Sequence, residues 1–365
     1  MKEINALDAT ANRRLADDGN TAGKSVKLIH VAVVGCGRWG INYLRVLQQM
    51  SGCRLVGACD PDPRSSDRFP FSSVTLPVFR DARAMFAQIR PDAVVVATPA
   101  TTHLSVASLA LKYGAHVLVE KPLATNSKDA AALVKMAGRA RRVLMVGHIF
   151  HYHNALIRLH AMIRKGELGR LRYLYSVRTN LGPIRDDVDV LWDLAAHDVS
   201  MMIHLAGGIP VSVTASGQNY IRKGIADVAF GTLFFPRNGI IGHLQVSWLD
   251  PRKVRKLTVI GTRRMAEFDD VSTQEPLRMY DRGVDRDTVI GDFGQFHLML
   301  RDGDIAIPRV AGGEPLRAEC ARFIECARTG KRPETDGEHG AAVVRVLEAL
   351  GKSLKVHGRP VRVGK

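Results

Sequence analysis

The feature that most constrains this chain is a glycine-rich turn that follows an apolar run and opens a helical stretch. The apolar run is Ile29–Val34, and the turn reads Gly35-Cys36-Gly37-Arg38-Trp39-Gly40. Glycines at this spacing let the backbone approach a pyrophosphate, and N–H groups at the start of the helix then face the phosphate charge. The turn therefore predicts a dinucleotide-binding βαβ unit. The residues expected to contact the cofactor here are Gly35, Gly37, Arg38, Trp39 and Gly40.

Residues 27–147 alternate short apolar runs with helix-length amphipathic stretches, which predicts an α/β Rossmann domain with a doubly wound parallel sheet. The expected strands are Ile29–Val34, Leu55–Cys59, Ala93–Thr98, Val117–Val119 and Val143–Val146. The expected helices are Ile41–Met50, Asp81–Ile89, Thr102–Tyr113 and Ser127–Ala140. We expect Asp81 and Ser127 to cap the second and fourth of these helices.

Residues 148–365 follow a different pattern, in which a helix over Asn154–Lys165 is followed by strands in succession. This predicts an α+β domain with a large open, mainly antiparallel sheet, which binds substrate and forms oligomers. Its C-terminal helices, Leu316–Ala327 and Gly340–Leu354, are candidates to pack back on the first domain. Residues 1–26 are predicted to be a flexible N-terminal extension. The expected strands are Leu171–Arg178, Ala229–Phe235, Ile240–Trp248 and Lys256–Ile260.

Composition excludes several classes of protein. The formal net charge is +16, but the basic residues are scattered and form no nucleic-acid-binding motif, so no nucleic-acid partner is predicted. The five cysteines form no Cys-x-x-Cys pair, which favours a reducing compartment over a disulfide framework or a zinc site. No apolar stretch approaches the roughly 20 residues of a membrane span. The sequence therefore predicts a cytoplasmic protein without a membrane partner.

Asp60 ends the second expected strand and follows the first glycine by 25 residues. A carboxylate near this position holds the ribose 2′-hydroxyl in related folds, which favours NAD over NADP. Arg64 and Arg68 lie just beyond it, where they could instead meet a 2′-phosphate, and the segment can also be a plain surface turn. A further cofactor contact is predicted where the strand Ala93–Thr98 ends, because ligands bind at the carboxyl edge of such sheets. The candidates there are Thr98, Pro99 and His103. The alternative interpretation of His103 is a solvent-exposed residue in the first turn of a helix.

Two further motifs carry candidate chemistry. Glu120-Lys121-Pro122 follows the strand Val117–Val119, so the lysine lies at the same sheet edge as the expected cofactor. Asp193 and His197 are four residues apart in a helical stretch, so they share a face, where a carboxylate can orient an imidazole and tune its basicity. Taken singly, each motif also has a structural interpretation, as a surface lysine and as a helix-capping Asp with a buried histidine.

Together and in this order, these motifs make the chain resemble the Gfo/Idh/MocA oxidoreductase family. The likeness spans about Val26 to Val363 and includes Ala97-Thr98-Pro99 with His103, Glu120-Lys121-Pro122, and Asp193 with His197-Asp198. The resemblance implies an NAD(P)-dependent dehydrogenase acting on CH–OH groups, with Glu120 and Lys121 near the cofactor. It also implies that Lys121 and His197 face a sugar, that Asp193 supports them, and that the Lys121–Pro122 peptide is cis.

Within that family the chain is similar to bacterial UDP-N-acetylglucosamine and UDP-N-acetylglucosaminuronate 3-dehydrogenases, which serve surface-polysaccharide synthesis. The segments that carry this likeness are Gly147–Asn154, Thr179–Arg185, Leu191–Asp193 and Ser247–Pro251. The resemblance implies a homodimer or homotetramer. The alternatives are a dehydrogenase of a free sugar or a polyol such as an inositol, and a non-enzymatic NAD(P)-binding regulator on the same scaffold.

Alcohol oxidation needs one group to take the hydroxyl proton and another to hold the oxygen. We expect His197 to be the general base and Lys121 to hydrogen-bond the oxygen, although these two roles can be exchanged. Substrate contacts are predicted for Tyr152, Asn180 and Arg185, with Arg178 as a further anion-binding candidate. No metal is predicted, even though His148, His151 and His153 cluster in the sequence.

Overall fold

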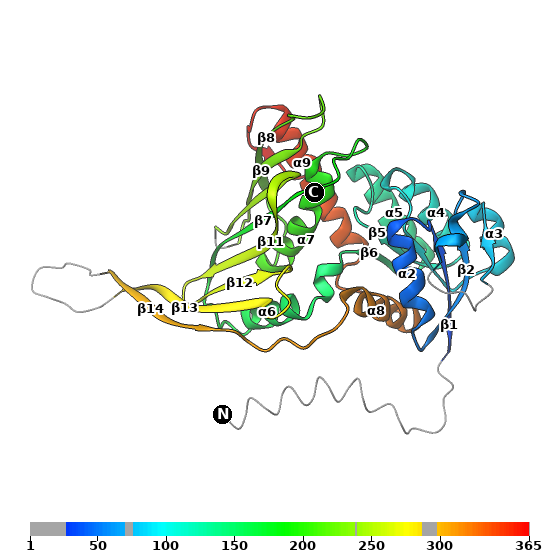
Figure 1. Cartoon of the computed structure of the whole chain (residues 1–365), viewed down its shortest axis with the longest axis horizontal. Helices are drawn as coiled ribbons and strands as arrows, with labels where there is room; N and C mark the ends of the chain where they lie inside the picture. The colour runs from blue at the N-terminus through cyan, green and yellow to red at the C-terminus, as the bar shows by residue number, and fades with distance from the viewer. Residues whose placement is uncertain (1–26, 70–75, 238, 287–297, 365) are drawn as a thin grey trace, which may run out of the picture.

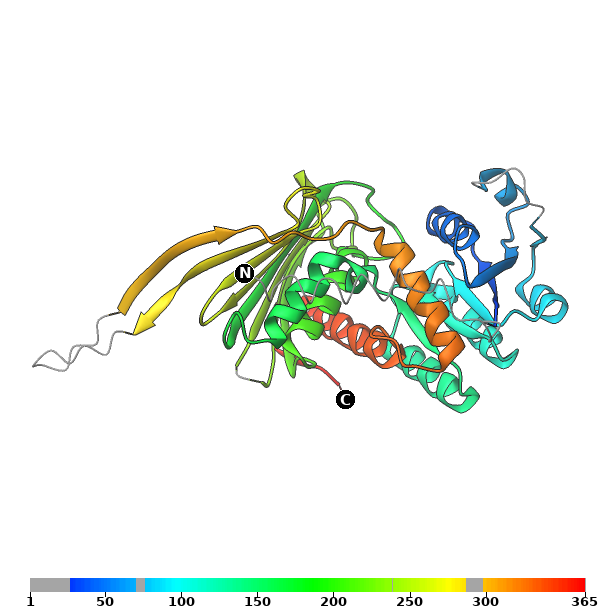
Figure 2. The same cartoon turned by 90° about the horizontal axis from the view of Figure 1, so that it is seen from below.

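The computed structural model describes residues 27–69, 76–237, 239–286 and 298–364. These residues form two units that lie side by side, each built on one β-sheet (Figures 1 and 2). The N-terminal extension predicted for residues 1–26 lies outside the described residues. Within the described ranges, no helix is both long enough and apolar enough to span a membrane.

The first unit is a six-stranded sheet of order β3-β2-β1-β4-β5-β6, and all of its pairings are parallel. The predicted doubly wound sheet is confirmed, although the two-residue edge strand β3 was not predicted. The strands are β1 (Ile29–Val34), β2 (Cys53–Cys59), β3 (Val78–Phe79), β4 (Ala93–Val96), β5 (His116–Glu120) and β6 (Leu144–Gly147). The helical elements are α2 (Arg38–Gln48), η1 (Ser65–Arg68), α3 (Ala82–Ile89), η2 (Ala100–Thr102), α4 (His103–Lys112) and α5 (Ser127–Ala140).

Helices cover both faces of this sheet, as the apolar composition of its strands requires. The helices α3, α4 and α5 pack on one face, and α2 packs on the other. A helix from far along the chain, α8 (Pro315–Thr329), completes the second face. Its residues Leu316, Cys320 and Phe323 are buried in the same core as β1 and α2. The first core therefore contains a segment that follows the second sheet in the sequence.

One of the two predicted helix caps is correct. Asp81 caps α3, because its carboxylate accepts a hydrogen bond of 2.7 Å from the N–H of Ala84. The prediction that Ser127 caps α5 is wrong, because Asn126 is the residue that accepts the N–H of Asp129, at 2.9 Å. Ser127 is the first helical residue. Its hydroxyl is free to donate to Glu348 at 2.7 Å, which fastens α5 to the C-terminal helix.

The second unit is a nine-stranded sheet of order β14-β13-β12-β11-β7-β10-β9-β8-β15. The pair β7–β10 is parallel and the other neighbours are antiparallel, so the predicted mainly antiparallel sheet is confirmed. The strands are β7 (Leu171–Leu181), β8 (Ser212–Gln218), β9 (Val228–Phe234), β10 (Ile241–Ser247), β11 (Leu249–Gly261), β12 (Met265–Asp269), β13 (Leu277–Arg286), β14 (Leu298–Ala306) and β15 (Val361–Arg362).

Helices cover one face of the second sheet, and the pair β13–β14 extends away from the rest of the molecule (Figure 2). The covering elements are η3 (Ile149–Tyr152), α6 (Asn154–Arg164), the π-helical η4 (Leu191–Ala195), α7 (Ala196–Ala206) and α9 (Gly337–Lys355). The opposite face is open, since Tyr173, Tyr175, Phe230 and Ile241 are all exposed there. The layering places the carboxyl edge of the first sheet against the second unit.

Candidate active site

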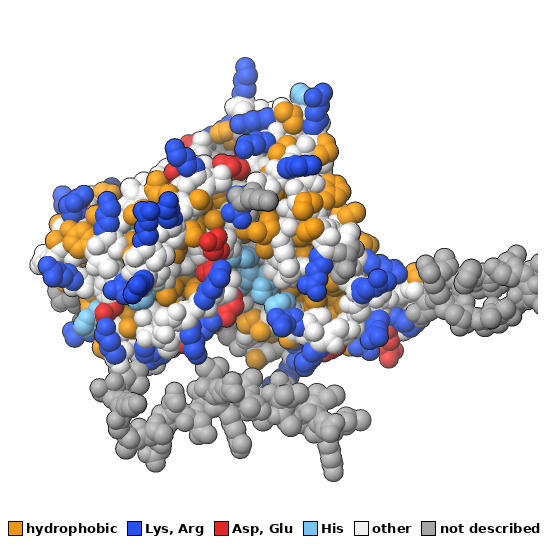
Figure 3. Space-filling view, turned by 180° about the vertical axis from the view of Figure 1, so that it is seen from behind, with side chains coloured by type: hydrophobic (Ala, Val, Ile, Leu, Met, Phe, Trp, Pro, Cys, Tyr) orange, Lys and Arg blue, Asp and Glu red, His pale blue; other side chains and the backbone are white. Residues whose placement is uncertain are grey.

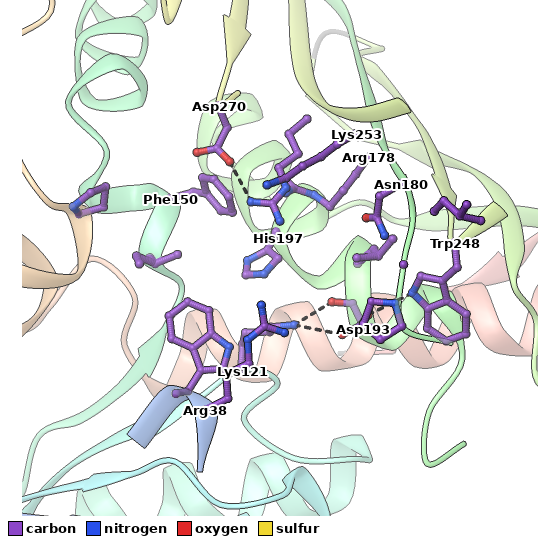
Figure 4. A pocket seen from close by; sticks show the side chains of 18 of the residues that line it. Arg38, Lys121, Phe150, Arg178, Asn180, Asp193, His197, Trp248, Lys253 and Asp270 are labelled. Atoms are coloured by element: carbon purple, nitrogen blue, oxygen red, sulfur yellow. Dashed lines mark hydrogen bonds and ion pairs between the residues drawn. The ribbon is translucent and has the colours of Figure 1, made fainter. Parts of the chain in front are cut away.

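A cleft of 650 Å³ lies where the carboxyl edge of the first sheet meets the second unit (Figure 4). It is lined from one side by α2 and the loop after β5, and from the other by η3, β7, η4, α7 and β11. Residues that are far apart in the sequence, from Arg38 to Pro315, therefore line the same cleft. The predicted site residues that line it are Arg38, Trp39, Lys121, Asn180, Asp193 and His197.

The glycine turn has the geometry that a phosphate site needs. Gly35 has a φ of 91°, and a Cβ on Gly40 would lie 1.8 Å from the carbonyl oxygen of Gly35, so both positions require glycine. At Gly37, by contrast, a Cβ would meet no described atom within 4 Å, which leaves space for a ligand. No side chain caps α2, so the N–H groups of its first turn are available to an anion. These residues fit the pyrophosphate of a dinucleotide.

Asp60 lies beside this turn. One of its carboxylate oxygens accepts the N–H of Cys36 at 2.6 Å and the other accepts the N–H of Asp62 at 2.9 Å. The carboxylate is therefore held at the position predicted for a ribose contact, and each oxygen keeps a second lone pair. Arg68, a candidate for a 2′-phosphate, forms an ion pair of 3.1 Å with Asp62 instead.

His103 is buried and both of its ring nitrogens face carbonyl oxygens. Nδ1 lies 2.9 Å from the oxygen of Pro122, and Nε2 lies 2.9 Å from the oxygen of Thr98. Burial lowers the pKa of His103, so the neutral ring donates to one of these carbonyls. The structure thus gives His103 no contact with the cleft. The ring instead joins the turn at Thr98-Pro99, which adjoins the glycine turn, to the turn that carries Lys121.

Lys121 follows β5, and its peptide bond to Pro122 is cis. Its Nζ donates to the carbonyl oxygen of Asp193 at 2.7 Å and lies 3.7 Å from the Asp193 carboxylate. Burial lowers the pKa of Lys121, while the charges of Asp193 and Glu120 act in the opposite direction. The net shift brings the amine closer to a state in which it can accept a proton near neutrality.

Glu120 lies behind Lys121, and the residues that line the cleft do not include it. Its carboxylate accepts the hydroxyl of Tyr43 at 2.9 Å and the N–H of Lys121 at 3.0 Å. The Tyr43 hydroxyl also lies 3.1 Å from Glu319 on α8. Because the phenol has one proton and burial raises the pKa of Glu319 well above its usual value, we infer that Glu319 is protonated and donates to Tyr43. Sequence reasoning missed this cluster, since no local pattern connects its members.

Asp193 and His197 are not arranged as the sequence predicted. Asp193 lies in the π-helical η4, in which the backbone repeats at five residues instead of four. Its carboxylate accepts from Trp248 Nε1 at 3.2 Å and from Arg185 at 3.3 Å, and no hydrogen bond between it and the imidazole is seen among the described residues. Asp193 therefore holds Lys121 and Arg185 instead of orienting the ring of His197.

The ring of His197 packs edge-on against Phe150, with centroids 5.0 Å apart. Its Nδ1 is buried and has no hydrogen-bond partner in the described part of the chain. Burial lowers the pKa of His197 well below its usual value, and the charges of Lys121 and Arg178 lower it further. The imidazole is therefore neutral and only weakly basic.

Tyr152, a predicted substrate contact, does not line the cleft. Its side chain is buried in the core of the first unit, where its hydroxyl lies 3.0 Å from Thr335 Oγ1. The segment η3 is a 3₁₀ turn with three residues per turn, so Phe150 and His153 share the side that lines the cleft. Arg185 forms ion pairs with Asp187 at 2.6 Å and with Asp193 at 3.3 Å, at the border of the site.

Basic residues of the second sheet line the cleft and were only partly predicted. Arg178 forms a buried ion pair of 2.8 Å with Asp198, and Arg255 forms a partly exposed ion pair of 3.1 Å with Asp270. Lys253 lies on the same strand as Arg255, two residues away. Residues two positions apart in a strand lie on the same face, so Lys253 and Arg255 face the cleft together. Their spacing within Arg252–Lys256 is visible in the sequence and could have predicted this.

The fold and the cleft together define a dinucleotide-dependent oxidoreductase. Residues 29–148 match the oxidoreductase family with an NAD-binding Rossmann fold, and residues 156–267 match the GFO/IDH/MocA C-terminal domain. The chain belongs to the Gfo/Idh/MocA oxidoreductase family, whose members act on CH–OH groups with NAD(P).

Similar proteins include dehydrogenases of sugars. UDP-N-acetylglucosamine 3-dehydrogenase of Acidithiobacillus ferrooxidans is 29% identical over 87% of this chain and 95% of its own length. Its structure superimposes with a TM-score of 0.75 and 26% identity, over 91% of this chain and 99% of that one. D-apiose dehydrogenase of Paraburkholderia graminis is 25% identical over 93% and 91%. The structure of GenD2 from gentamicin A biosynthesis, in complex with NAD, gives a TM-score of 0.76 at 25% identity over 95% and 99%.

Proposed function

We propose that this enzyme oxidises a secondary hydroxyl of a nucleotide sugar, at C3 of a UDP-N-acetylhexosamine or its uronic acid, with NAD as the hydride acceptor. The observation that carries the proposal is a lysine of lowered pKa in a cleft whose charged lining residues are mostly cations. The likeness to a UDP-N-acetylglucosamine 3-dehydrogenase over nearly that protein's whole length supports this choice of substrate. By the same likeness, we place the reaction in surface-polysaccharide biosynthesis.

The charge of the cleft suits a pyrophosphate. Five Lys and Arg residues and two Asp residues line it. The carboxylates are already engaged, as Asp270 pairs with Arg255 and Asp193 with Lys121 and Arg185. Lys253 and Arg38, by contrast, have no ion-pair partner among the described residues. A nucleotide sugar brings two phosphate charges, and a uronic acid adds a third, so these cations have a natural ligand.

We propose NAD over NADP because a carboxylate occupies the ribose position. Asp60 is held there by two backbone N–H groups, and Arg68 is already paired with Asp62. A 2′-phosphate at that place would meet the negative charge of Asp60, whereas a 2′-hydroxyl can donate a hydrogen bond to it.

We propose that Lys121, as a neutral amine, takes the proton of the sugar hydroxyl. This reverses the roles first expected, because His197 is too weakly basic to be the proton acceptor. The nicotinamide, when bound, accepts the hydride from the same carbon. Its positive ring would lower the pKa of Lys121 further, which favours the amine form at the moment of reaction.

His197 and Asp193 then have supporting roles. The neutral imidazole can donate its N–H to the reacting oxygen and so stabilise negative charge that develops there. Asp193 holds Nζ of Lys121 through its carbonyl oxygen, and Trp248 and Arg185 in turn hold its carboxylate. Of the two residues proposed to act on the substrate, Lys121 thus comes from the first unit and His197 from the second.

The test is the absorbance of NADH on mixing purified protein with NAD and either UDP-N-acetylglucosamine or UDP-N-acetylglucosaminuronate, with and without 2-oxoglutarate. We expect turnover by the wild type and none above background by Lys121→Ala. D-apiose and an inositol serve as comparison substrates. NADH formed with a free sugar but not with the nucleotide sugars would replace the proposed substrate class, and absence of NADH with every substrate would favour the regulator.

We also propose that the open face of the second sheet joins two copies of the chain. Tyr173 and Tyr175 on β7 and Ile241 on β10 expose apolar surface there. Light scattering of the purified protein should give the mass of a dimer or tetramer. Tyr175→Asp, which charges the centre of this face, should shift that mass toward the monomer.

A further inference from the structure

A row of five histidine rings crosses the second unit beside the cleft. In order it consists of His148, His339, His151, His204 and His160, and we call it the histidine row. Consecutive ring centroids lie 5.4, 4.9, 4.6 and 3.8 Å apart. The rings come from four separate elements, namely η3 with the residue that precedes it, α9, α7 and α6. Tertiary packing therefore creates the row, and no sequence motif announces it.

At the middle of the row, one hydroxyl joins two imidazoles. Ser200 Oγ lies 2.8 Å from Nε2 of His151 and 2.8 Å from Nε2 of His339. The hydroxyl has one proton, so it donates to one ring and accepts from the other. The mirror-image arrangement has the same number of hydrogen bonds. A proton can therefore move from one imidazole to the other through Ser200 by a shift of hydrogens alone.

The rings of the row are neutral. Burial lowers the pKa of His148 and His151 well below the usual value, and it lowers the pKa of His204 and His339 to about 4. A neutral imidazole has one nitrogen that donates and one that accepts, so it can take a proton on one side and release another on the opposite side. The row thus holds no standing charge that would block a passing proton.

The inner end of the row adjoins Lys121. Glu120 on β5 pairs in register with Gly147 on β6, so Lys121 and His148 leave neighbouring parallel strands side by side. Such strands lie about 4.8 Å apart. The charge of Lys121 also contributes to the lowered pKa of His148. Both ring nitrogens of His148 are buried without a hydrogen-bond partner among the described residues, although its neighbour Ile149 lines the cleft.

The outer end of the row reaches the surface. His160 and His204, at this end, are half-buried, and the row also reaches the surface at its second ring, because the half-buried His339 lines a surface hollow of 300 Å³ with Glu334 and Glu338. Figure 3 shows histidine side chains near the middle of the face opposite to that of Figure 1, beside acidic side chains. Half-buried His160 can release a proton to water at this end of the row.

The row does not have the geometry of a metal centre, because no group of three or more His, Cys, Asp or Glu side chains in the described ranges could hold an ion. Core packing alone does not explain it either. An apolar ring would fill the place of His148 without burying two unpartnered nitrogens, which costs free energy.

We propose that the histidine row conducts the proton released by alcohol oxidation from Lys121 to the opposite face of the molecule. The proposal rests on the proposed function, because oxidation of the alcohol is what releases a proton. The hydroxyl O–H bond breaks, the proton binds Nζ of Lys121, and the lysine passes a proton to one nitrogen of His148. A substrate hydroxyl or a water molecule bridges this first step.

From His148 each ring accepts a proton at one nitrogen and releases the proton of its other nitrogen. Ser200 accepts from His339 while it donates to His151, and His204 and His160 complete the path. Rotation of the imidazoles about χ2 brings the nitrogens of neighbouring edge-on or tilted rings closer together, since this torsion is soft. The balance is one proton from the sugar to bulk water, with Lys121 restored as an amine.

The first test is His148→Phe, which replaces the imidazole by an aromatic ring without nitrogens; neither nitrogen has a hydrogen-bond partner to lose among the described residues. In a stopped-flow turnover with NAD and UDP-N-acetylglucosamine, NADH absorbance and a pH-indicator dye are followed together. In the wild type both signals should rise together. In His148→Phe, NADH should form while the dye signal lags, and kcat should fall about tenfold with KM changed less than twofold.

His116→Asn is the matched control, because this half-buried histidine lies at the start of β5, outside the row and the cleft, and the amide can still accept the N–H of Val143. It should leave both signals unchanged. Simultaneous NADH and dye signals at wild-type kcat in His148→Phe would overturn the proposal.

The second test needs no turnover. Ring ¹⁵N NMR of the NAD-loaded protein should show His151 and His339 with complementary Nε2 protonation that exchanges, and Ser200→Ala should stop this exchange while Ser200→Thr restores it. If the tautomers of His151 and His339 are fixed, and are the same in the wild type and Ser200→Ala, the proposed proton transfer through Ser200 is contradicted. If the wild type forms no NADH from the nucleotide sugar, the proposed function fails, and the NMR result still decides the histidine row.

Discussion

The two walls of the cleft differ in how far apart in the sequence their contacting residues lie. The cofactor wall consists of the glycine turn, Asp60 and the start of α2, all within the first βα units of the chain. The substrate wall combines η3, β7, η4 and β11, whose contacts join residues far apart in the sequence. Local geometry determines the first wall, whereas the packing of a nine-stranded sheet on helices determines the second.

This difference teaches where sequence motifs carry chemical detail. On the cofactor wall, the positive φ of Gly35 and the contact of Gly40 with the backbone of Gly35 explain why glycine is needed at these two positions. On the substrate wall, the spacing of Asp193 and His197 suggested a dyad, but the π turn between them separates their roles. Motifs therefore locate a substrate site more reliably than they assign its hydrogen bonds.

The largest expected effect tests which side chain removes the proton. Lys121→Met should lower kcat/KM by about 10³-fold or more, because the proton acceptor is lost. His197→Gln, which keeps a hydrogen-bond donor at the substrate wall, should lower it by about tenfold to a hundredfold. Initial rates of NADH formation measure both. A greater loss of kcat/KM in His197→Gln than in Lys121→Met would show that His197, and not Lys121, is the general base.

The next effect concerns the ion pair beneath the substrate wall. Asp198→Asn leaves Arg178 as an uncompensated buried cation, so the free energy of unfolding should fall by about 3–5 kcal/mol. Asp187→Asn is the matched control, because its ion pair with Arg185 is exposed and should contribute less than about 1 kcal/mol. Urea denaturation of the three proteins measures the difference, and equal losses would show that burial of the pair is not decisive.

The cofactor wall should separate stability from binding. Gly40→Ala places a Cβ against the backbone of Gly35, so the free energy of unfolding should fall by about 1–3 kcal/mol. Gly37→Ala has open space and should retain stability while weakening NAD, because the methyl group occupies the approach of the pyrophosphate. Thermal unfolding with and without NAD distinguishes the two. The same stability loss in both variants would contradict this division.

The smallest effect is the acid sensitivity of the second unit. Histidines of the unfolded chain take up protons below about pH 6.5, whereas His204 and His339 do so only near pH 4 in the folded protein. The stability they confer is thus complete above pH 6.5 and is lost as the pH falls toward 4. Calorimetry should show Tm falling by a few degrees between pH 7 and 5, and His339→Gln should reduce the slope. A Tm that does not change with pH would mean that the folded and unfolded chains bind protons equally, which would contradict the lowered pKa of these two histidines.

The fold was largely predictable because its signals are periodic. Alternating apolar runs and amphipathic stretches predicted the parallel sheet. Only its strand β3 was not predicted, because two residues are too few to show a periodic pattern. Ser127 was mistaken for a cap because Asn126, an equally good cap, precedes it by one position. Strands β8, β12, β13, β14 and β15 were not predicted, although the class of the sheet that contains them was.

The site was predictable only as far as chain neighbours decide it. Lys121 and His197 reach the cleft as expected because a strand end and a helix start place them there. Tyr152 does not, since a 3₁₀ turn sends it to the opposite side from Phe150. The carboxyl pair of Glu120 and Glu319 and the histidine row depend on α8, α9 and α7 meeting in space. No spacing in the sequence encodes such meetings.

The position of α8 has a consequence for how the chain is made. Its residues Leu316, Cys320 and Phe323 complete a face of the first sheet, whose last strand ends at Gly147. A ribosome adding roughly 5–20 residues per second leaves that apolar face uncovered for on the order of ten seconds. During this interval the nascent first unit is exposed to aggregation and is a natural client for chaperones. Halting synthesis before α8 emerges should therefore leave a chain that binds them persistently.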